Sequence, residues 1–212
     1  QVRVAMYKHA LPAFGPAPVQ SITKRDVNRL IDKIVDAGSP VAANRVLAFT
    51  KRFFSWCKER DILELSPAEA IRPPSKEKTR DRVLTLEEIK GFWAACGQMG
   101  YPWGPIFQLL LLTGARLREV SQASWDEVSI ADGTLSLPSS RTKNARPHQI
   151  QLSDQALSII QALPKVGGHD LLFTTNGKTP VSGFSKVKKR LDIMSDVTNW
   201  RFHDLRRSFA TH

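Results

Sequence analysis

The hydrophobic positions in the first part of the chain recur at helical spacing. Between Val27 and Val35 the apolar residues lie three and four positions apart, which places them on one face of a helix. Thr23 can cap the start of this helix, and Gly38 can end it. We therefore predict a helix over residues 21–38.

A second helix is predicted after Pro40, and its apolar face is formed by Val46, Phe49, Phe53, Trp56 and Cys57. Basic residues occupy its other faces. Residues 1–11 are predicted to be the remaining part of a third helix, which ends at Pro12. Together the three elements predict a small helical domain over residues 1–72, incomplete at its start.

The apolar periodicity stops between residues 66 and 82, where prolines and charged side chains predominate. We place a linker at residues 73–82 and a second domain at residues 83–212. The composition of the linker fits an ordinary connection, and it fits equally well a basic segment that lies on DNA while two domains close around the duplex. The residues that would make this contact are Arg72, Lys76, Lys78, Arg80 and Arg82.

Beyond the linker the pattern changes from helical to extended and back to helical. Thr85 and Glu88 have the spacing of a capping box, so a helix is predicted to start there. Further helices are predicted over residues 106–112, 117–124, 153–163 and 184–194, and strands over residues 128–130, 134–137 and 148–152. The predicted fold class is mainly α with a small antiparallel β-sheet.

Positive charge is the main feature of the composition. The chain has 31 Lys and Arg residues against 20 Asp and Glu residues, a formal net charge of +11. This excess favours a polyanionic partner, although a merely soluble basic surface explains the charge equally well. No apolar run approaches the ~20 residues that span a bilayer, so neither membrane insertion nor secretion is expected. Cys57 and Cys96 are predicted to be buried free thiols, since no nearby His or Cys completes a metal site.

Two arginine motifs stand out in the second domain. The sequence TGARLRE occupies residues 113–119 at a predicted helix start, HDLRR occupies residues 203–207, and a strand-flanked connection between them carries Lys143. Each motif alone also fits an ordinary helix start with a surface salt bridge, or a chance HxxR match. Their order resembles the catalytic domain of tyrosine recombinases. Residues 43–46 and 54–56 similarly resemble the helical core-binding domain of phage and genomic-island integrases.

This resemblance implies an α+β catalytic domain in which Arg116 and Arg206 bind the scissile phosphate. Planar guanidinium groups can donate paired hydrogen bonds to the non-bridging oxygens, which gain charge as the phosphodiester is attacked. Glu119 is close enough to orient the guanidinium of Arg116, with a plain surface pair as the alternative. By the same resemblance, Lys143 is the general acid for the leaving 5′ oxygen. His203 exchanges a proton with the nucleophile or hydrogen-bonds to the phosphate.

Other basic residues are predicted to contact double-stranded DNA at an attachment or recombination site. They are Arg45, Lys51 and Arg52 in the helical domain, Lys76, Lys78, Arg80 and Arg82 in the linker, and Arg118 and Arg207 beside the two motifs. The resemblance also implies a homotetramer on DNA for the intact protein, with DNA-bending accessory proteins as further partners. A bacterial or phage protein of this kind is expected in the cytoplasm, with the nucleoid, as part of a mobile element.

The nucleophile of the resembled family is missing from the sequence. The family needs a second His or Trp and then a tyrosine, both C-terminal to the HxxR motif, whereas this chain ends six residues after Arg206 and its tyrosines, Tyr7 and Tyr101, precede Arg116. We therefore predict that the chain binds DNA without cutting it, while the intact protein performs DNA recombination and integration. The implied reaction is a transesterification that uses no metal, ATP or other cofactor. A DNA-binding module without chemistry and a type IB topoisomerase-like enzyme remain as alternatives.

Overall fold

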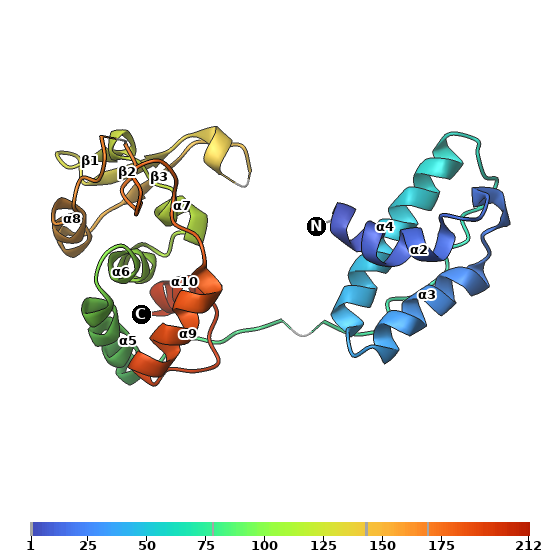
Figure 1. Cartoon of the computed structure of the whole chain (residues 1–212), viewed down its shortest axis with the longest axis horizontal. Coiled ribbons are helices and arrows are strands. Elements are labelled where there is room, and N and C mark those ends of the chain that lie inside the picture. The colour runs from blue at the N-terminus through green and yellow to red at the C-terminus, as the bar shows by residue number, and fades with distance from the viewer. Residues whose placement is uncertain (1, 78, 143, 169) are drawn as a thin grey trace. The chain divides into compact units, whose positions relative to one another are not determined.

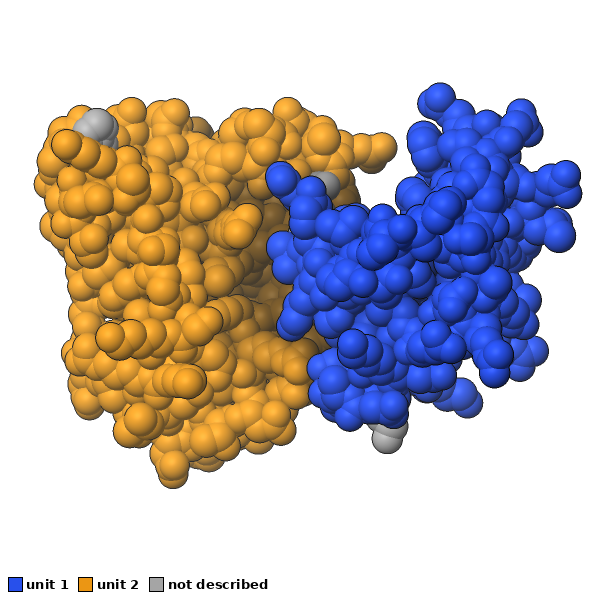
Figure 2. Space-filling model, turned by 45° about the vertical axis from the view of Figure 1, so that its right-hand side comes forward, with its two compact units in different colours: residues 1–79 blue, residues 80–212 orange. Residues whose placement is uncertain are grey.

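The chain folds into two compact units. The computed structural model describes residues 2–77, 79–142, 144–168 and 170–212, and these divide into unit 1, residues Gln1–Thr79, and unit 2, residues Arg80–His212 (Figure 2). Both units are mainly helical, and unit 2 contains a small antiparallel sheet. The predicted fold class is thus confirmed.

Unit 1 is built around two amphipathic helices, α3 (Lys24–Asp36) and α4 (Pro40–Glu59), which pack on each other (Figure 1). Before them the chain forms α1 (Val2–Ala5), a π-helical segment (Met6–Ala10), α2 (Leu11–Phe14) and a 3₁₀ turn (Val19–Ser21). The Thr23 side chain caps α3 together with Asp26 in a capping box. Apolar side chains from α3 and α4 form the core, among them Val27, Leu30, Ile31, Val46, Leu47 and Phe54.

Two expectations for unit 1 are wrong in detail. The first helical stretch does not end at Pro12 but continues to Phe14, because a proline in the first turn of α2 needs no intrahelical N–H bond. In α4, Phe53 and Trp56 are 40% and 42% exposed, whereas Phe54 is fully buried. The face of α4 turned to the core therefore runs through Phe54 rather than through Phe53, and the two exposed rings stack on each other at its edge.

The predicted linker, residues 73–82, has contacts to unit 1 at its start and lies in unit 2 at its end. In unit 1 the Asn44 side chain donates to the Ser75 carbonyl at 2.9 Å and accepts from the Ser75 N–H at 3.3 Å. At the other end Arg80 already belongs to unit 2. The chain passes from unit 1 to unit 2 between Thr79 and Arg80, within the predicted linker.

Unit 2 combines six helices with a three-stranded sheet among its described residues. The helices are α5 (Leu86–Met99), α6 (Trp103–Thr113), α7 (Leu117–Ser121), α8 (Asp154–Gln161), α9 (Phe184–Ser195) and α10 (Phe202–Thr211). Strands β1 (Val128–Ser129), β2 (Thr134–Leu137) and β3 (His148–Gln151) pair antiparallel in that order, and Leu135 lies opposite Ile150. Short 3₁₀ turns occur at Trp125–Glu127 and Ser139–Arg141. The predicted helices and strands are confirmed with small shifts of their ends, and α10 is an addition to them.

One hydrophobic core holds unit 2 together. Its fully buried side chains come from α5, α6, α9, α10 and the sheet, and include Phe92, Phe107, Leu110, Leu137, Leu191 and Leu205. Helix α10 packs on α6, so the second arginine motif lies against the helix that precedes the first. In the part of the chain that the structure describes, no helix is both long and apolar enough to cross a membrane.

The two cysteines are buried and free, as predicted. Burial raises the pKa of the Cys96 thiol to about 12, so this thiol stays protonated at neutral pH. Both side chains therefore behave as small apolar residues of the two cores.

Candidate active site

The turn between α6 and α7 requires glycine at position 114 for two independent reasons. Gly114 ends α6 with a φ of +59°, in the left-handed region that side chains disfavour. A Cβ atom at this position would also lie 2.4 Å from Cδ1 of Phe209 on α10. The turn is thus closely packed against α10, and the chain that leaves it places Arg116 immediately before α7.

Arg116 and Glu119 form a tight pair at the start of α7. The Arg116 backbone N–H donates to Glu119 Oε2 at 2.7 Å, and Nη1 of its guanidinium donates to Glu119 Oε1 at 2.5 Å. Glu119 is buried, whereas the Arg116 side chain is 42% exposed. Glu119 thus holds the guanidinium of Arg116 through one nitrogen, while the rest of the group still faces solvent.

The ionised form of Glu119 is favoured by its surroundings. Burial acts to raise its pKa, but the hydrogen bonds from Arg116 and the positive charges of Arg116 and Arg206 outweigh burial and hold the pKa below its ordinary value. Glu119 therefore carries a negative charge at neutral pH and accepts both hydrogen bonds.

Arg206 reaches the same turn from α10. Its Nη1 donates to the carbonyl oxygen of Gly114 at 2.9 Å, across 92 residues of sequence. His203 precedes Arg206 by three residues on α10 and is exposed, so the two lie on the same side of that helix. The structure thus brings Arg116, Glu119 and Arg206 together around one turn, with His203 one helical turn from Arg206.

Lys143 lies outside the described residues, but the segment before it is firmly attached to α7. Arg141 pairs with the carboxylate of Glu127 and donates through Nη2 to the carbonyl oxygens of Arg118 and Glu119 at 3.1 and 3.0 Å. These carbonyls belong to a helix of five residues, where few intrahelical partners are available. The sequence analysis did not predict a role for Arg141. The local pattern shows only that an arginine precedes the candidate lysine by two positions.

The predicted DNA-binding residues fall into two groups. Arg118 is exposed and so is Lys76, while Lys78 lies outside the described residues. In unit 1, Arg45 and Arg52 are exposed and face Glu77 and Glu59 across 3.7 and 3.2 Å, and Lys51 Nζ donates to the Glu69 carbonyl at 3.1 Å. These residues keep surface positions from which long side chains can reach a phosphate.

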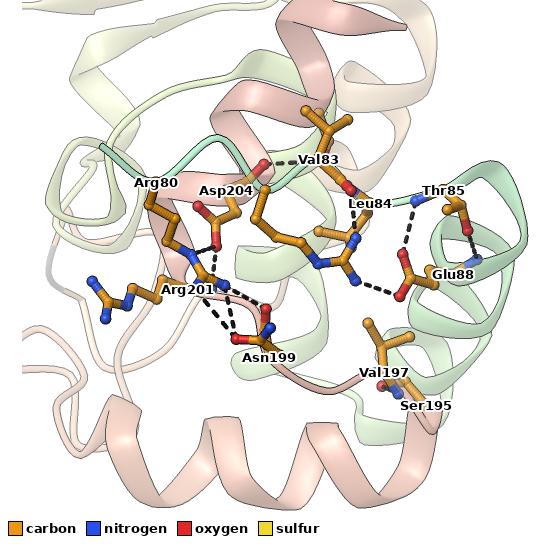
Figure 3. Close-up of polar contacts among 12 residues, drawn as sticks. Arg80, Val83, Leu84, Thr85, Glu88, Ser195, Val197, Asn199, Arg201 and Asp204 are labelled. Carbon is orange, nitrogen blue, oxygen red and sulfur yellow. Dashed lines mark hydrogen bonds and ion pairs between the residues drawn. The ribbon is translucent and has the colours of Figure 1, made fainter. Parts of the chain in front are cut away.

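The second group is engaged within unit 2, as Figure 3 shows for Arg80. Arg80 Nε donates to Asp204 Oδ2 at 2.9 Å, Arg207 Nη1 donates to Asp204 Oδ1 at 2.7 Å, and Arg82 pairs with the Glu88 carboxylate. Their side chains are partly buried, so these three arginines stabilise the fold of unit 2. Contact of these three arginines with DNA, expected from the sequence, stays a prediction.

The metal-ligand types His, Cys, Asp and Glu do not gather in groups of three anywhere in the described ranges. The charged groups around the Gly114 turn are instead two guanidinium groups and one carboxylate. This arrangement presents hydrogen-bond donors and positive charge to a ligand.

Comparison with known proteins agrees with the fold. Residues 82–212 match the Phage integrase family, and residues 1–73 match the Phage integrase central domain. Prophage integrase IntZ of Escherichia coli strain K12 is 27% identical over 219 residues, covering 100% of this chain and 53% of that protein.

Solved structures of lambda integrase share the fold at 18% identity. A dimer of its residues 75–356 bound to a COC′ core site gives a TM-score of 0.80, covering 99% of this chain and 80% of that chain. A tetramer bound to a Holliday junction gives 0.78, covering 99% and 65%.

The chain has the two units of a tyrosine recombinase. In the second unit, Arg116 follows the turn between α6 and α7, and Arg206 reaches this turn from α10. The chain belongs to the phage integrase family. It spans about half the length of the curated relatives it matches.

Proposed function

We propose that the intact protein recombines DNA at a specific site by transesterification at a phosphodiester. The observation that carries this proposal is the convergence of Arg116 and Arg206 on the Gly114 turn, with the buried carboxylate of Glu119 holding the first of them. Two guanidinium groups from distant segments can bind the two non-bridging oxygens of one phosphate. Because these oxygens gain charge as the phosphorus becomes pentacovalent, the arginines stabilise the transition state more than the ground state.

In this mechanism a tyrosine hydroxyl attacks the scissile phosphorus and the bond from phosphorus to the 5′ oxygen breaks. The tyrosine proton passes to a base, a role that suits the exposed His203, and the leaving 5′ oxygen takes a proton from Lys143. The products are a 3′-phosphotyrosyl linkage and a 5′-hydroxyl, and attack by the hydroxyl of a second strand reverses the step. The tyrosine is proposed to come from a part of the protein outside this chain, since neither Tyr7 nor Tyr101 matches its place in the family.

The proposed partner is double-stranded DNA that carries the recombination site of a phage or genomic island. The net charge of +11 and the exposed cations of both units support binding to phosphates. By analogy with the lambda integrase tetramer on a Holliday junction, the intact protein is proposed to act as a homotetramer. DNA-bending proteins are proposed as accessory factors, and the cytoplasm, where the nucleoid lies, as the place of action.

The test separates binding from strand cleavage. The full-length protein is incubated with a nicked duplex that carries the junction of its element, and covalent adducts and binding are measured in parallel. Arg116→Ala and Arg206→Ala are expected to abolish adducts while site binding falls by less than about tenfold, since each removes one or two phosphate contacts. An equal loss of adduct formation and of site binding would indicate a DNA-binding module without chemistry. Relaxation of supercoiled DNA without site preference would indicate a topoisomerase, and adducts from the 212-residue chain would contradict the predicted lack of a nucleophile.

A further inference from the structure

Helix α10 has two opposite faces with different partners. His203 and Arg206 lie on the face turned to the Gly114 turn and solvent. Asp204 and Ser208, with His212 after the helix, follow at intervals of four residues and lie on another face. Since residues 204 and 206 are separated by about 200° around the helix axis, a contact made by Asp204 acts on α10 from behind the arginine.

Asp204 is fully buried, and both of its carboxylate oxygens accept hydrogen bonds, of which Figure 3 shows the one from Arg80. Oδ2 accepts from Arg80 Nε at 2.9 Å and from the Arg201 backbone N–H at 2.8 Å, and Oδ1 accepts from Arg207 Nη1 at 2.7 Å. Arg80 is further fixed by hydrogen bonds to the carbonyl and side-chain oxygens of Asn199. The first turn of α10 is thus tied to the start of unit 2, 124 residues earlier in the chain.

The same segment is bound to α10 one and two turns further along. The Leu84 N–H donates to Ser208 Oγ at 2.9 Å, and Ser208 Oγ donates in turn to the Asp204 carbonyl at 2.9 Å. His212 Nε2 lies 2.9 Å from the Leu84 carbonyl oxygen. Residues 80–84 therefore lie along the rear face of α10 over the whole length of the helix.

The charge on Asp204 is maintained despite its burial. Burial acts to raise the pKa of this carboxyl, but the hydrogen bonds from Arg80, Arg201 and Arg207 outweigh it and hold the pKa below its ordinary value. An ionised carboxylate without water needs these donors, and the donors are held in place by the carboxylate. A displacement of the Asp204 carboxylate would therefore break the hydrogen bonds of its donors, and a displacement of the donors would leave a buried charge without partners.

We propose that Asp204, through its ion pair with Arg80, is a positioning residue for the phosphate-binding face of α10. It sets the placement of Arg206 and His203 relative to Arg116, although it touches neither DNA nor the reacting atoms. This inference rests on the proposed function, because it concerns the strand-cleavage step of the same site. It also assigns Arg80 to the support of the active site instead of to DNA contact.

The chain contains a matched control for this contact. Glu88 stands at the third position of α5, as Asp204 does in α10, and it likewise accepts from a capping backbone N–H, that of Thr85, at 2.8 Å. It also pairs with an arginine of the same segment, Arg82. Glu88→Gln therefore removes the same kind of capping ion pair from a helix that carries no candidate catalytic residue.

The experiment compares Asp204→Asn, Arg80→Gln and Glu88→Gln in the full-length protein. Single-turnover cleavage is measured well below each melting temperature, together with DNA affinity. Asp204→Asn and Arg80→Gln are expected to slow cleavage by up to about 10²-fold, the effect of an ångström-scale misplacement, with DNA affinity nearly unchanged. Glu88→Gln is expected to change the cleavage rate by no more than about threefold, the range of a substitution away from a site.

A second substrate distinguishes positioning from a general loss of structure. When a methylphosphonate replaces the scissile phosphate, one charged oxygen that Arg206 would bind is absent, so its exact placement matters less. The rate ratio between wild type and Asp204→Asn is therefore expected to shrink at least tenfold on this substrate. An unchanged ratio on both substrates, or an equal loss in Glu88→Gln, would overturn the positioning role. Absence of cleavage of the phosphate substrate by the wild-type protein would instead refute the proposed function.

Discussion

At the scale of single residues, the site depends on an arginine that is paired with a buried carboxylate and is still partly exposed to solvent. Glu119 is buried with both oxygens bound to Arg116, and that arginine still exposes 42% of its side chain. The local spacing of three residues predicted this contact. The second arginine of the site, Arg206, donates to the carbonyl of Gly114 in the turn before Arg116. This contact spans 92 residues, so no local pattern could reveal it.

Substitution of Glu119 tests the link between this charge and stability. Glu119→Gln is expected to lower the free energy of unfolding at pH 7 by about 1–3 kcal/mol, because two hydrogen bonds to a buried carboxylate are weakened. The native pKa of Glu119 is depressed, so its contribution is complete above the unfolded-state pKa of about 4.3 and is lost as the pH falls through the lower native value. Urea unfolding from pH 7 into this acid range should show the two proteins converging. A difference independent of pH would contradict the assignment.

Gly114 offers a second test at this scale. Gly114→Ala places a side chain at positive φ and brings its Cβ within 2.4 Å of the Phe209 ring, so a loss of more than about 1 kcal/mol is expected. Gly97 in α5 is the control, since a Cβ there meets nothing within 4 Å, and Gly97→Ala should stabilise by up to about 1 kcal/mol. Thermal unfolding of the two variants checks both signs. Equal effects would show that the turn is not closely packed.

At the scale of elements, the local pattern predicted most helices and strands but not how they are fastened together. Strand β2, the cap at Thr23 and the capping box at Thr85 were readable because their signals lie within a few residues. The face of α4 was misjudged because Phe53 and Phe54 are equally apolar and only packing against α3 selects between them. Arg80 and Arg82 looked like a basic linker because their carboxylate partners are chosen by tertiary structure.

The connection between β2 and β3 is predicted to depend on Arg141. Arg141→Gln removes the guanidinium that bridges Glu127 and two carbonyls of α7, so the amide protons of residues 139–142 and 144–146 are expected to exchange faster. It also leaves the buried Glu127 without its partner, which should cost about 1–3 kcal/mol. Lys189→Gln, a change of the same charge on the surface of unit 2, is the control for hydrogen exchange. Unchanged exchange in the connection would show that Arg141 does not hold it.

At the scale of the whole molecule, the protein is basic and each of its two units matches a part of the phage integrase family. The order of the arginine motifs predicted the family because these motifs are short and local. The pairing of Asp204 with Arg80 had no such signal, since it joins residues 124 positions apart. Fold class was therefore easier to predict than the support of the site.

Salt dependence tests the proposed DNA contacts of the chain. The affinity for duplex DNA is expected to fall steeply with salt, with a slope of about −0.9 for each phosphate neutralised. Arg45→Gln should reduce this slope by about 1 on any DNA sequence, because it removes one phosphate contact. Lys90→Gln, which removes an exposed charge paired with Glu87, is the control. A slope that Arg45→Gln leaves unchanged would remove Arg45 from the DNA interface.

The central claim is that the site around Arg116 and Arg206 serves a phosphotyrosyl transfer. The most direct measurement is to trap the full-length protein on a nicked recombination site and to identify the modified residue by mass spectrometry. One DNA-linked tyrosine is expected, C-terminal to Arg206, and the linkage should not form when either arginine is replaced. Cleavage that leaves no protein–DNA linkage, or a linkage to Tyr7 or Tyr101, would contradict it.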